Sequence, residues 1–141
     1  MKEPLITEET IRILIKNFYE KVLSDKQLKP VFIEAIGEDN HAWEPHLETM
    51  YDFWSSIMLN SGRYKGNPLQ KHRLLPPFDS ALFNRWLELF AETAREIHTE
   101  EIAISYIEKS NRIAESLKLG LYFDLTPGTD GRIGPIRSNG G

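Results

Sequence analysis

The 141-residue chain has no cysteine, which excludes disulfides, thiolate catalysis, iron–sulfur clusters and cysteine-ligated zinc. The four histidines are its remaining soft metal ligands. Runs of about 18 apolar residues, which would predict a membrane-spanning helix, are missing as well. The first six residues show neither the apolar stretch nor the small-residue cleavage site of a secretory signal. We therefore expect a soluble, cytoplasmic protein that does not bind membranes.

Clusters of basic residues are also lacking. The 17 Lys and Arg are scattered among 21 Asp and Glu, which gives a formal net charge of −4 and no electrostatic footprint for nucleic acid. The hydrophobic share of 40% is close to the average for globular proteins, so we expect one domain and a monomer. The aromatic share of 11% exceeds what a plain helical bundle of this size needs, which suggests a flat, bulky ligand.

Apolar residues recur at helical spacing along most of the chain, and no segment alternates as a strand would. The pattern predicts four long helices, over 7–24, 42–59, 80–98 and 99–121, and two short ones over 30–37 and 69–75. Thr7 is the predicted N-cap of the first helix, and Asp79 or Ser80 that of the helix over 80–98. We expect an all-α domain at 1–124 and, because the remainder is rich in glycine, a flexible tail at 125–141.

His72 is the strongest candidate for a metal ligand. Pro68 and the Pro76-Pro77 pair bracket its short helix, since proline cannot continue a helix, and the imidazole is therefore presented from a pre-ordered segment. A lone histidine in a loop is more often solvated, but this setting favours a haem ligand, because one proximal histidine commonly holds haem iron. Neighbours in the sequence can cover the porphyrin face or meet its propionates: Leu69, Leu74, Leu75 and Phe78 for the face, and Arg63, Tyr64, Lys71 and Arg73 for the propionates.

Tyr19, His46 and Trp86 each border an apolar helical stripe, and Phe53 follows His46 on the same stripe. A buried hydroxyl or indole N–H needs a hydrogen-bond partner, and a bound O₂ could be that partner. Taken singly, each residue is more often structural, as a solvated histidine or a core aromatic. Their joint occurrence with His72 favours a ligand site. The other histidines and tryptophans are expected to be structural: His41 in a polar loop, His98 at a helix C-terminus where the dipole favours its charge, and Trp43 and Trp54 as core or haem-edge packing.

The sequence resembles the group III truncated haemoglobins over nearly all of residues 7–122. The residues that carry the resemblance are Asn17-Phe18-Tyr19-Glu20-Lys21-Val22, Pro30-Val31-Phe32, Trp43-Glu44-Pro45-His46, Tyr64-Lys65-Gly66-Asn67-Pro68-Leu69-Gln70-Lys71-His72, Leu75-Pro76-Pro77-Phe78 and Arg85-Trp86-Leu87-Glu88-Leu89-Phe90. It implies a two-over-two globin fold, haem b with His72 as proximal ligand, Phe32 against the haem, and a distal cage of Tyr19, His46 and Trp86. The family pattern does not account for the segment after Asp124.

Three classes of function remain open from the sequence. The first binds O₂, NO or CO and retains O₂ for nitric oxide dioxygenase-like or peroxidase-like chemistry, which needs a reductase that the sequence does not identify. The second is a gas-sensing or storage module without turnover. The third is a haem-free helical interaction protein, which predicts a colourless preparation.

Overall fold

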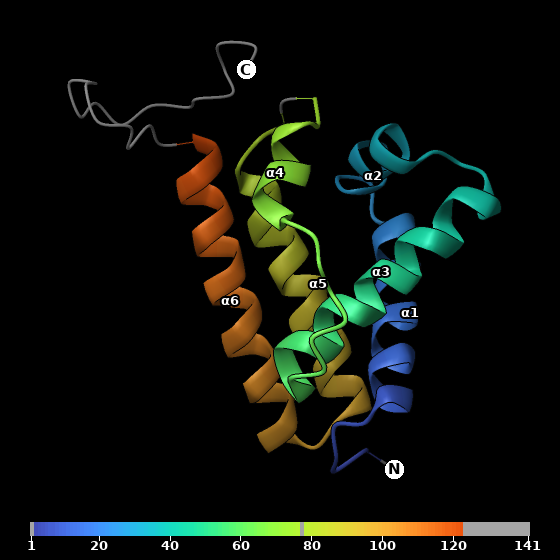
Figure 1. The fold of residues 1–141 in the computed structure, drawn as a ribbon, viewed down its shortest axis with the longest axis vertical. Coiled ribbons are helices and arrows are strands. Elements are labelled where there is room, and N and C mark those ends of the chain that lie inside the picture. Colours follow the sequence, from blue (N-terminus) through green and yellow to red (C-terminus); the bar gives the residue numbers. More distant parts are fainter. Residues whose placement is uncertain (1, 77, 123–141) are drawn as a thin grey trace.

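The computed structural model describes residues 2–76 and 78–122, and this part of the chain contains six helices and no strand (Figure 1). The expected all-α fold is therefore confirmed. The segment predicted to be a flexible tail, 125–141, lies outside the described residues. In chain order the helices are α1 (Glu8–Ser24), α2 (Lys29–Ile36), α3 (Asn40–Leu59), α4 (Pro68–Arg73), α5 (Ala81–Ile97) and α6 (Glu100–Tyr122).

The four long helices form two packed pairs. Helix α1 contacts both α3 and α5, and α5 runs antiparallel to α6 along most of its length (Figure 1). The short helix α2 packs against α1 and α3, whereas the short helix α4 packs against α6. None of the helices in the described ranges is long and apolar enough to cross a membrane.

The apolar stripe predicted for the first helix is the buried face of α1. Ile11, Leu14, Ile15 and Phe18 are almost wholly buried, in keeping with their helical spacing. Thr7 is the N-cap, as predicted: its Oγ1 accepts from the Thr10 backbone N–H at 3.0 Å. The Thr10 hydroxyl accepts in return from the Thr7 N–H at 2.9 Å, which satisfies two backbone donors at the helix start.

Stacked aromatic rings fill the centre of the core. Phe90 stacks on Trp54 with ring centroids 4.8 Å apart, and on Trp86 at 5.4 Å. Phe18 contacts Trp86 and Phe90 edge to face, and Tyr106 contacts Trp54 at 5.8 Å. These rings come from all four long helices, so their contacts help to fix how the two helix pairs pack on each other.

One prediction about a histidine is wrong in detail. Helix α3 starts at Asn40, two residues before the predicted start, because the Asp39 carboxylate caps the His41 N–H at 2.9 Å. His41 is therefore in the first helical turn rather than in a loop. His98 lies at a helix C-terminus, as predicted, where it is the C-cap of α5 and is fully buried. Its Nδ1 lies 2.9 Å from the Glu3 carbonyl oxygen.

Candidate functional site

A cavity of about 390 Å³ lies between α3, α4 and α5, with α2 at one end and α6 beneath it. This volume falls in the range of about 300–1,000 Å³ that is typical of cofactor and ligand sites. Apolar and aromatic side chains make up most of its lining. The structure brings ten of the fourteen sequence-predicted site residues to this cavity: Tyr19, Phe32, His46, Phe53, Tyr64, Lys71, His72, Leu75, Phe78 and Trp86. The other four, Leu69, Leu74, Arg63 and Arg73, do not line it.

His72 enters the cavity from α4. Its Nδ1 lies 2.7 Å from the Pro68 carbonyl oxygen, which can only accept a hydrogen bond. Nδ1 therefore carries the proton in this contact, and Nε2 carries the lone pair able to bind a metal. The imidazole also lies near Phe83, with ring centroids 6.4 Å apart. A histidine oriented by a backbone carbonyl is the usual arrangement for a metal ligand.

Helix α4 has only six residues, and such a short helix needs tertiary support. The Asn67 side chain caps it by accepting from the Gln70 N–H at 3.1 Å. At its other end, Arg73 donates to the Gly120 carbonyl of α6 at 3.0 Å. Gly120 also permits close packing, since a Cβ there would lie 2.5 Å from a methyl carbon of Leu69. The orientation of His72 thus depends on the C-terminal end of α6.

His46 lies in α3 among aromatic rings, 5.2 Å from the Tyr19 ring and 5.5 Å from Trp43 by centroid. Its Nε2 is buried and has no hydrogen-bond partner in the described part of the chain. Burial, together with a smaller electrostatic effect of His72, lowers the pKa of His46 to about 4. The imidazole is therefore neutral at physiological pH. An unpaired buried nitrogen beside a cavity fits a site that is completed by a ligand.

The neutral state of His46 can be checked by titration. We expect its imidazole resonances in the carbon-monoxide-bound protein to show no protonation until the pH falls toward about 4. Because the folded-state pKa lies below the ordinary value of 6.5, protonation opposes folding, and stability falls as the pH drops from 6.5 toward 4. A midpoint near 6.5 in the NMR titration would contradict the buried, neutral imidazole.

Tyr19 and Trp86 bring two hydrogen-bond donors to the same cavity. Only 6% of Tyr19 is exposed, and burial raises the pKa of its hydroxyl, so it stays protonated. Trp86 is held between Phe18 and Phe90, which fixes the plane of its indole. Within the ranges that the structure describes, neither the Tyr19 hydroxyl nor the indole N–H of Trp86 makes a hydrogen bond with protein. Both donors are available to a guest in the cavity.

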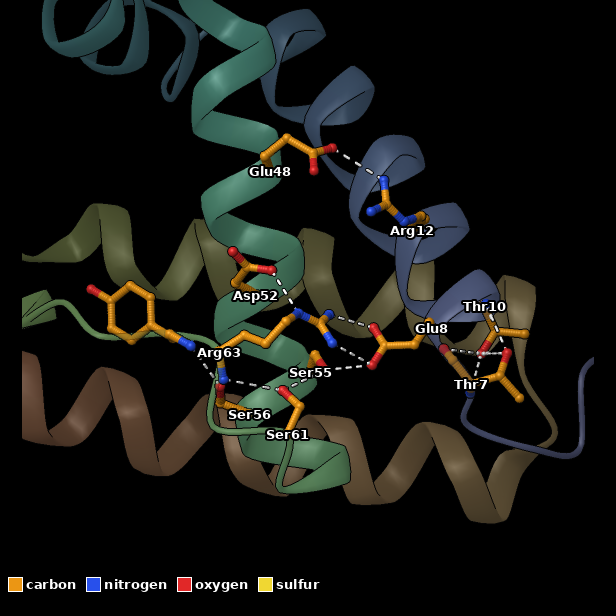
Figure 2. Close-up of polar contacts among 11 residues, drawn as sticks. Thr7, Glu8, Thr10, Arg12, Glu48, Asp52, Ser55, Ser56, Ser61 and Arg63 are labelled. Atoms are coloured by element: carbon orange, nitrogen blue, oxygen red, sulfur yellow. Dashed lines mark hydrogen bonds and ion pairs between the residues drawn. The ribbon is translucent and has the colours of Figure 1, made fainter.

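Tyr64 reaches the cavity from the loop between α3 and α4. A network of hydrogen bonds and ion pairs holds this loop against α1 and α3 (Figure 2). Arg63 donates to Glu8 at 2.6 and 3.0 Å and to Asp52 at 2.9 Å. The Tyr64 N–H donates to the Ser56 hydroxyl at 2.9 Å. Tyr64 then packs edge to face on Phe53 at 5.2 Å, so the loop lies against the cavity wall.

Arg63 and Arg73, which the sequence offered as partners of the haem propionates, do not line the cavity. The carboxylates of Glu8 and Asp52 hold Arg63, and the Gly120 carbonyl holds Arg73. The acceptors lie 11 to 55 residues away from these arginines in the sequence, so local spacing could not reveal them. Tyr64 and Lys71 are the two predicted polar residues that do reach the cavity.

We expect Arg63→Ala to lower the free energy of unfolding only slightly, because the ion pairs are nearly half exposed. Hydrogen exchange at the Tyr64 amide should become faster, since the loop loses its anchor. Hydrogen bonds from Arg63 and Ser55 lower the pKa of Glu8 to about 2, so their stabilisation is present above pH 4.5 and is lost as the pH falls toward 2. The variant should lose the part of this acid-range dependence that Arg63 provides, whereas Arg12→Ala, which breaks a separate pair with Glu48, should leave loop exchange unchanged.

Sequence reasoning missed part of the cavity lining. Most of the additional residues are apolar and come from several helices, among them Leu28, Met50, Leu82, Phe83, Ile113, Ala114 and Leu117. Periodicity identified most of these positions as inward-facing. It could not distinguish a face that packs on another helix from one that borders a cavity.

No protein-family profile matches the chain. Among curated proteins, the chain is 38% identical over 122 residues to the group 3 truncated hemoglobin ctb of Campylobacter jejuni, covering 86% of this chain and 96% of that protein. Among solved structures, the crystal structure of a group III truncated hemoglobin from Campylobacter jejuni matches with a TM-score of 0.83 and 38% identity. That match also covers 86% of this chain and 96% of the other.

Proposed function

Because the chain belongs to the group III truncated haemoglobin family and has its globin fold, we propose that haem b is bound through His72 and that Tyr19, His46 and Trp86 hold a diatomic ligand. The family assignment supports a haem globin that binds small gases such as O₂, NO or CO. The further proposal is that this chain retains O₂ for reaction with nitric oxide or for peroxide chemistry instead of delivering it.

The observation that carries the proposal is the pairing of an oriented imidazole with unsatisfied polar groups around one apolar cavity. His72 is oriented by the Pro68 carbonyl and lines the same cavity as His46. His46 Nε2 is buried without a protein partner. These residues fit haem, whose flat apolar face suits the lining and whose propionates suit Tyr64 and Lys71 at the cavity wall. Bound haem would supply an iron atom at which a diatomic gas can bind.

The residues opposite His72 determine how such a gas is held. The Tyr19 hydroxyl keeps its proton and donates, and the indole N–H of Trp86 can only donate. Neutral His46 can donate or accept and places no charge in the cavity. The surrounding aromatic rings keep water out, which strengthens each of these hydrogen bonds. O₂ gains partial negative charge when it binds, so these donors would slow its release, which suits chemistry on O₂ and argues against transport.

The test is consumption of nitric oxide by the oxygenated protein with a chemical reductant supplied. We expect repeated conversion of nitric oxide to nitrate for as long as O₂ and reductant last. The reductant stands in for a reductase, which the proposal requires. Consumption that stops after a single equivalent per protein, with haem still bound and reductant present, would instead indicate a gas-sensing or storage module.

A further inference from the structure

Trp43 packs behind two of the side chains that face the proposed haem cavity. Its ring lies 5.8 Å from the Tyr19 ring and 5.5 Å from the His46 ring by centroid, and it meets both edge to face. Tyr19 and His46 line the cavity, whereas Trp43 does not. Any effect of Trp43 on a ligand in the cavity must therefore pass through these two neighbours.

A hydrogen bond fixes the plane of the Trp43 indole. Its Nε1–H donates to the Gly37 carbonyl at 2.7 Å, and the Gly37 N–H donates to the Ile33 carbonyl at 2.7 Å. Gly37 is the C-cap of α2 and has a φ of 107°, which glycine adopts without strain. Phe32 of α2 also stacks on the indole, with centroids 6.4 Å apart. The indole is thus fastened to the end of α2.

The first turn of α3 has a particular need for this bond. Pro45 has no N–H, so the His41 carbonyl loses the donor that a helix normally supplies four residues later. Trp43 lies in this turn, and His46 follows directly after the proline. The hydrogen bond from Trp43 to Gly37 joins the turn to α2, and it thereby limits movement of the backbone that carries His46.

The His46 ring depends on its aromatic neighbours for its orientation. Its Nε2 is buried and has no hydrogen-bond partner among the residues that the structure describes. The imidazole instead meets Tyr19 and Trp43 at nearly right angles, with interplanar angles of 85° and 87°. Movement of the indole would therefore change the direction in which His46 points, and that of the Tyr19 ring beside it.

Trp43 also borders solvent on its other side. A second pocket of about 470 Å³ lies between α1, α2 and α3, and both Tyr19 and Trp43 line it. Exposed charged residues surround this pocket: Lys16, Glu20, Lys29 and Glu38. His46 does not line it. A smaller side chain in place of the indole would give water a route from this pocket to His46.

We propose that Trp43 is a positioning residue: bonded to Gly37, it holds the Tyr19 hydroxyl and the His46 imidazole in the orientation that hydrogen-bonds a diatomic ligand. It also keeps water from reaching these groups from behind. The inference rests on the proposed function, because it needs a ligand in the haem cavity. It assigns control of ligand release to a residue outside that cavity.

The experiment is infrared spectroscopy of the ferrous, carbon-monoxide-bound protein, because the C–O stretching frequency falls when hydrogen bonds are donated toward the ligand. Trp43→Phe keeps an aromatic ring and removes the donor to Gly37. We expect its C–O band to be broader than that of the wild type and shifted to higher frequency, since Tyr19 and His46 point at the ligand for less of the time. Release of O₂ should be about 2 to 12 times faster, as for the loss of one hydrogen bond.

Gly37→Ala tests the same hydrogen bond from its acceptor and leaves the indole in place. The added Cβ would meet no atom within 4 Å, but a φ of 107° is strained for alanine, so the carbonyl should move away from the indole. We expect a C–O shift in the same direction as in Trp43→Phe. Combining the two substitutions should add little, because both remove one bond. A combined shift equal to the sum of the single shifts would refute the bond as the means of positioning.

Tyr51→Leu is the matched control for a merely structural role. Tyr51 is a buried aromatic residue of the same helix, and it lines neither the cavity nor the second pocket. Its replacement should lower the Tm and leave the C–O band unchanged. If Trp43→Phe likewise lowers the Tm without changing the band or the O₂ release rate, the positioning role is wrong and the proposed function stands. Absence of a Soret band from wild-type protein supplied with hemin would overturn the proposed function itself.

Discussion

His72→Ala is expected to abolish the Soret band of protein supplied with hemin. Loss of a partner that merely orients a metal-binding histidine lowers affinity about 10- to 100-fold, so loss of the ligand itself should lower haem affinity by more than that. Because the side chain is half-buried at the end of a short surface helix, the helical fold should survive, and circular dichroism can verify it. Absorption spectra of the ferric, ferrous and carbon-monoxide-bound forms provide the measurement.

His41→Ala is the matched control for this result. His41 is exposed in the first turn of α3 and does not line the cavity, so its removal should leave the spectrum unchanged. Free imidazole added to His72→Ala should restore part of the Soret band by filling the space of the lost ring. An unaltered spectrum in His72→Ala would show that another residue holds the iron.

The double variant Tyr19→Phe, Trp86→Leu should release O₂ about 5 to 150 times faster than the wild type, since each hydrogen bond contributes about 0.5–1.5 kcal/mol. Both replacement side chains are apolar, so the two donors are lost, and Tyr19→Phe also keeps the ring, whereas Trp86→Leu leaves a smaller side chain. Stopped-flow displacement of O₂ by carbon monoxide measures the rate directly.

The two single variants divide this effect between the donors. If both bind the same ligand, the sum of their separate effects should differ from that of the double variant, because groups that share one partner couple. Tyr51→Phe, far from the cavity lining, should release O₂ at the wild-type rate. An unchanged rate in the double variant would refute slow release as the basis of the function.

Much of the fold was predictable because its information is local. The stripe on α1, the Thr7 cap and the clamped helix carrying His72 each follow from residues within one or two helical turns of one another. The ten cavity residues could be named because amphipathic spacing and the family resemblance agreed on the same positions.

The remaining features depend on contacts that are distant in sequence. Arg63 finds Glu8 at a separation of 55 residues, and His98 finds Glu3 at 95, and neither pairing has a local signature. The start of α3 was placed two residues late for a different reason, because the Asp39 side chain that caps the helix was not recognised as its N-cap in the sequence.

Because α4 is attached to α6, the position of His72 on one side of the cavity depends on the position of the last turn of α6. Arg73 grips the Gly120 carbonyl, and the Tyr122 hydroxyl donates to the Phe78 carbonyl at 2.7 Å, so both flanks of the segment that carries His72 are tied to the last turn of α6. A displacement of that last turn would be transmitted to α4 and would tilt the imidazole of His72. Ligand affinity on the far side of the cavity would then respond to force or docking at the end of α6.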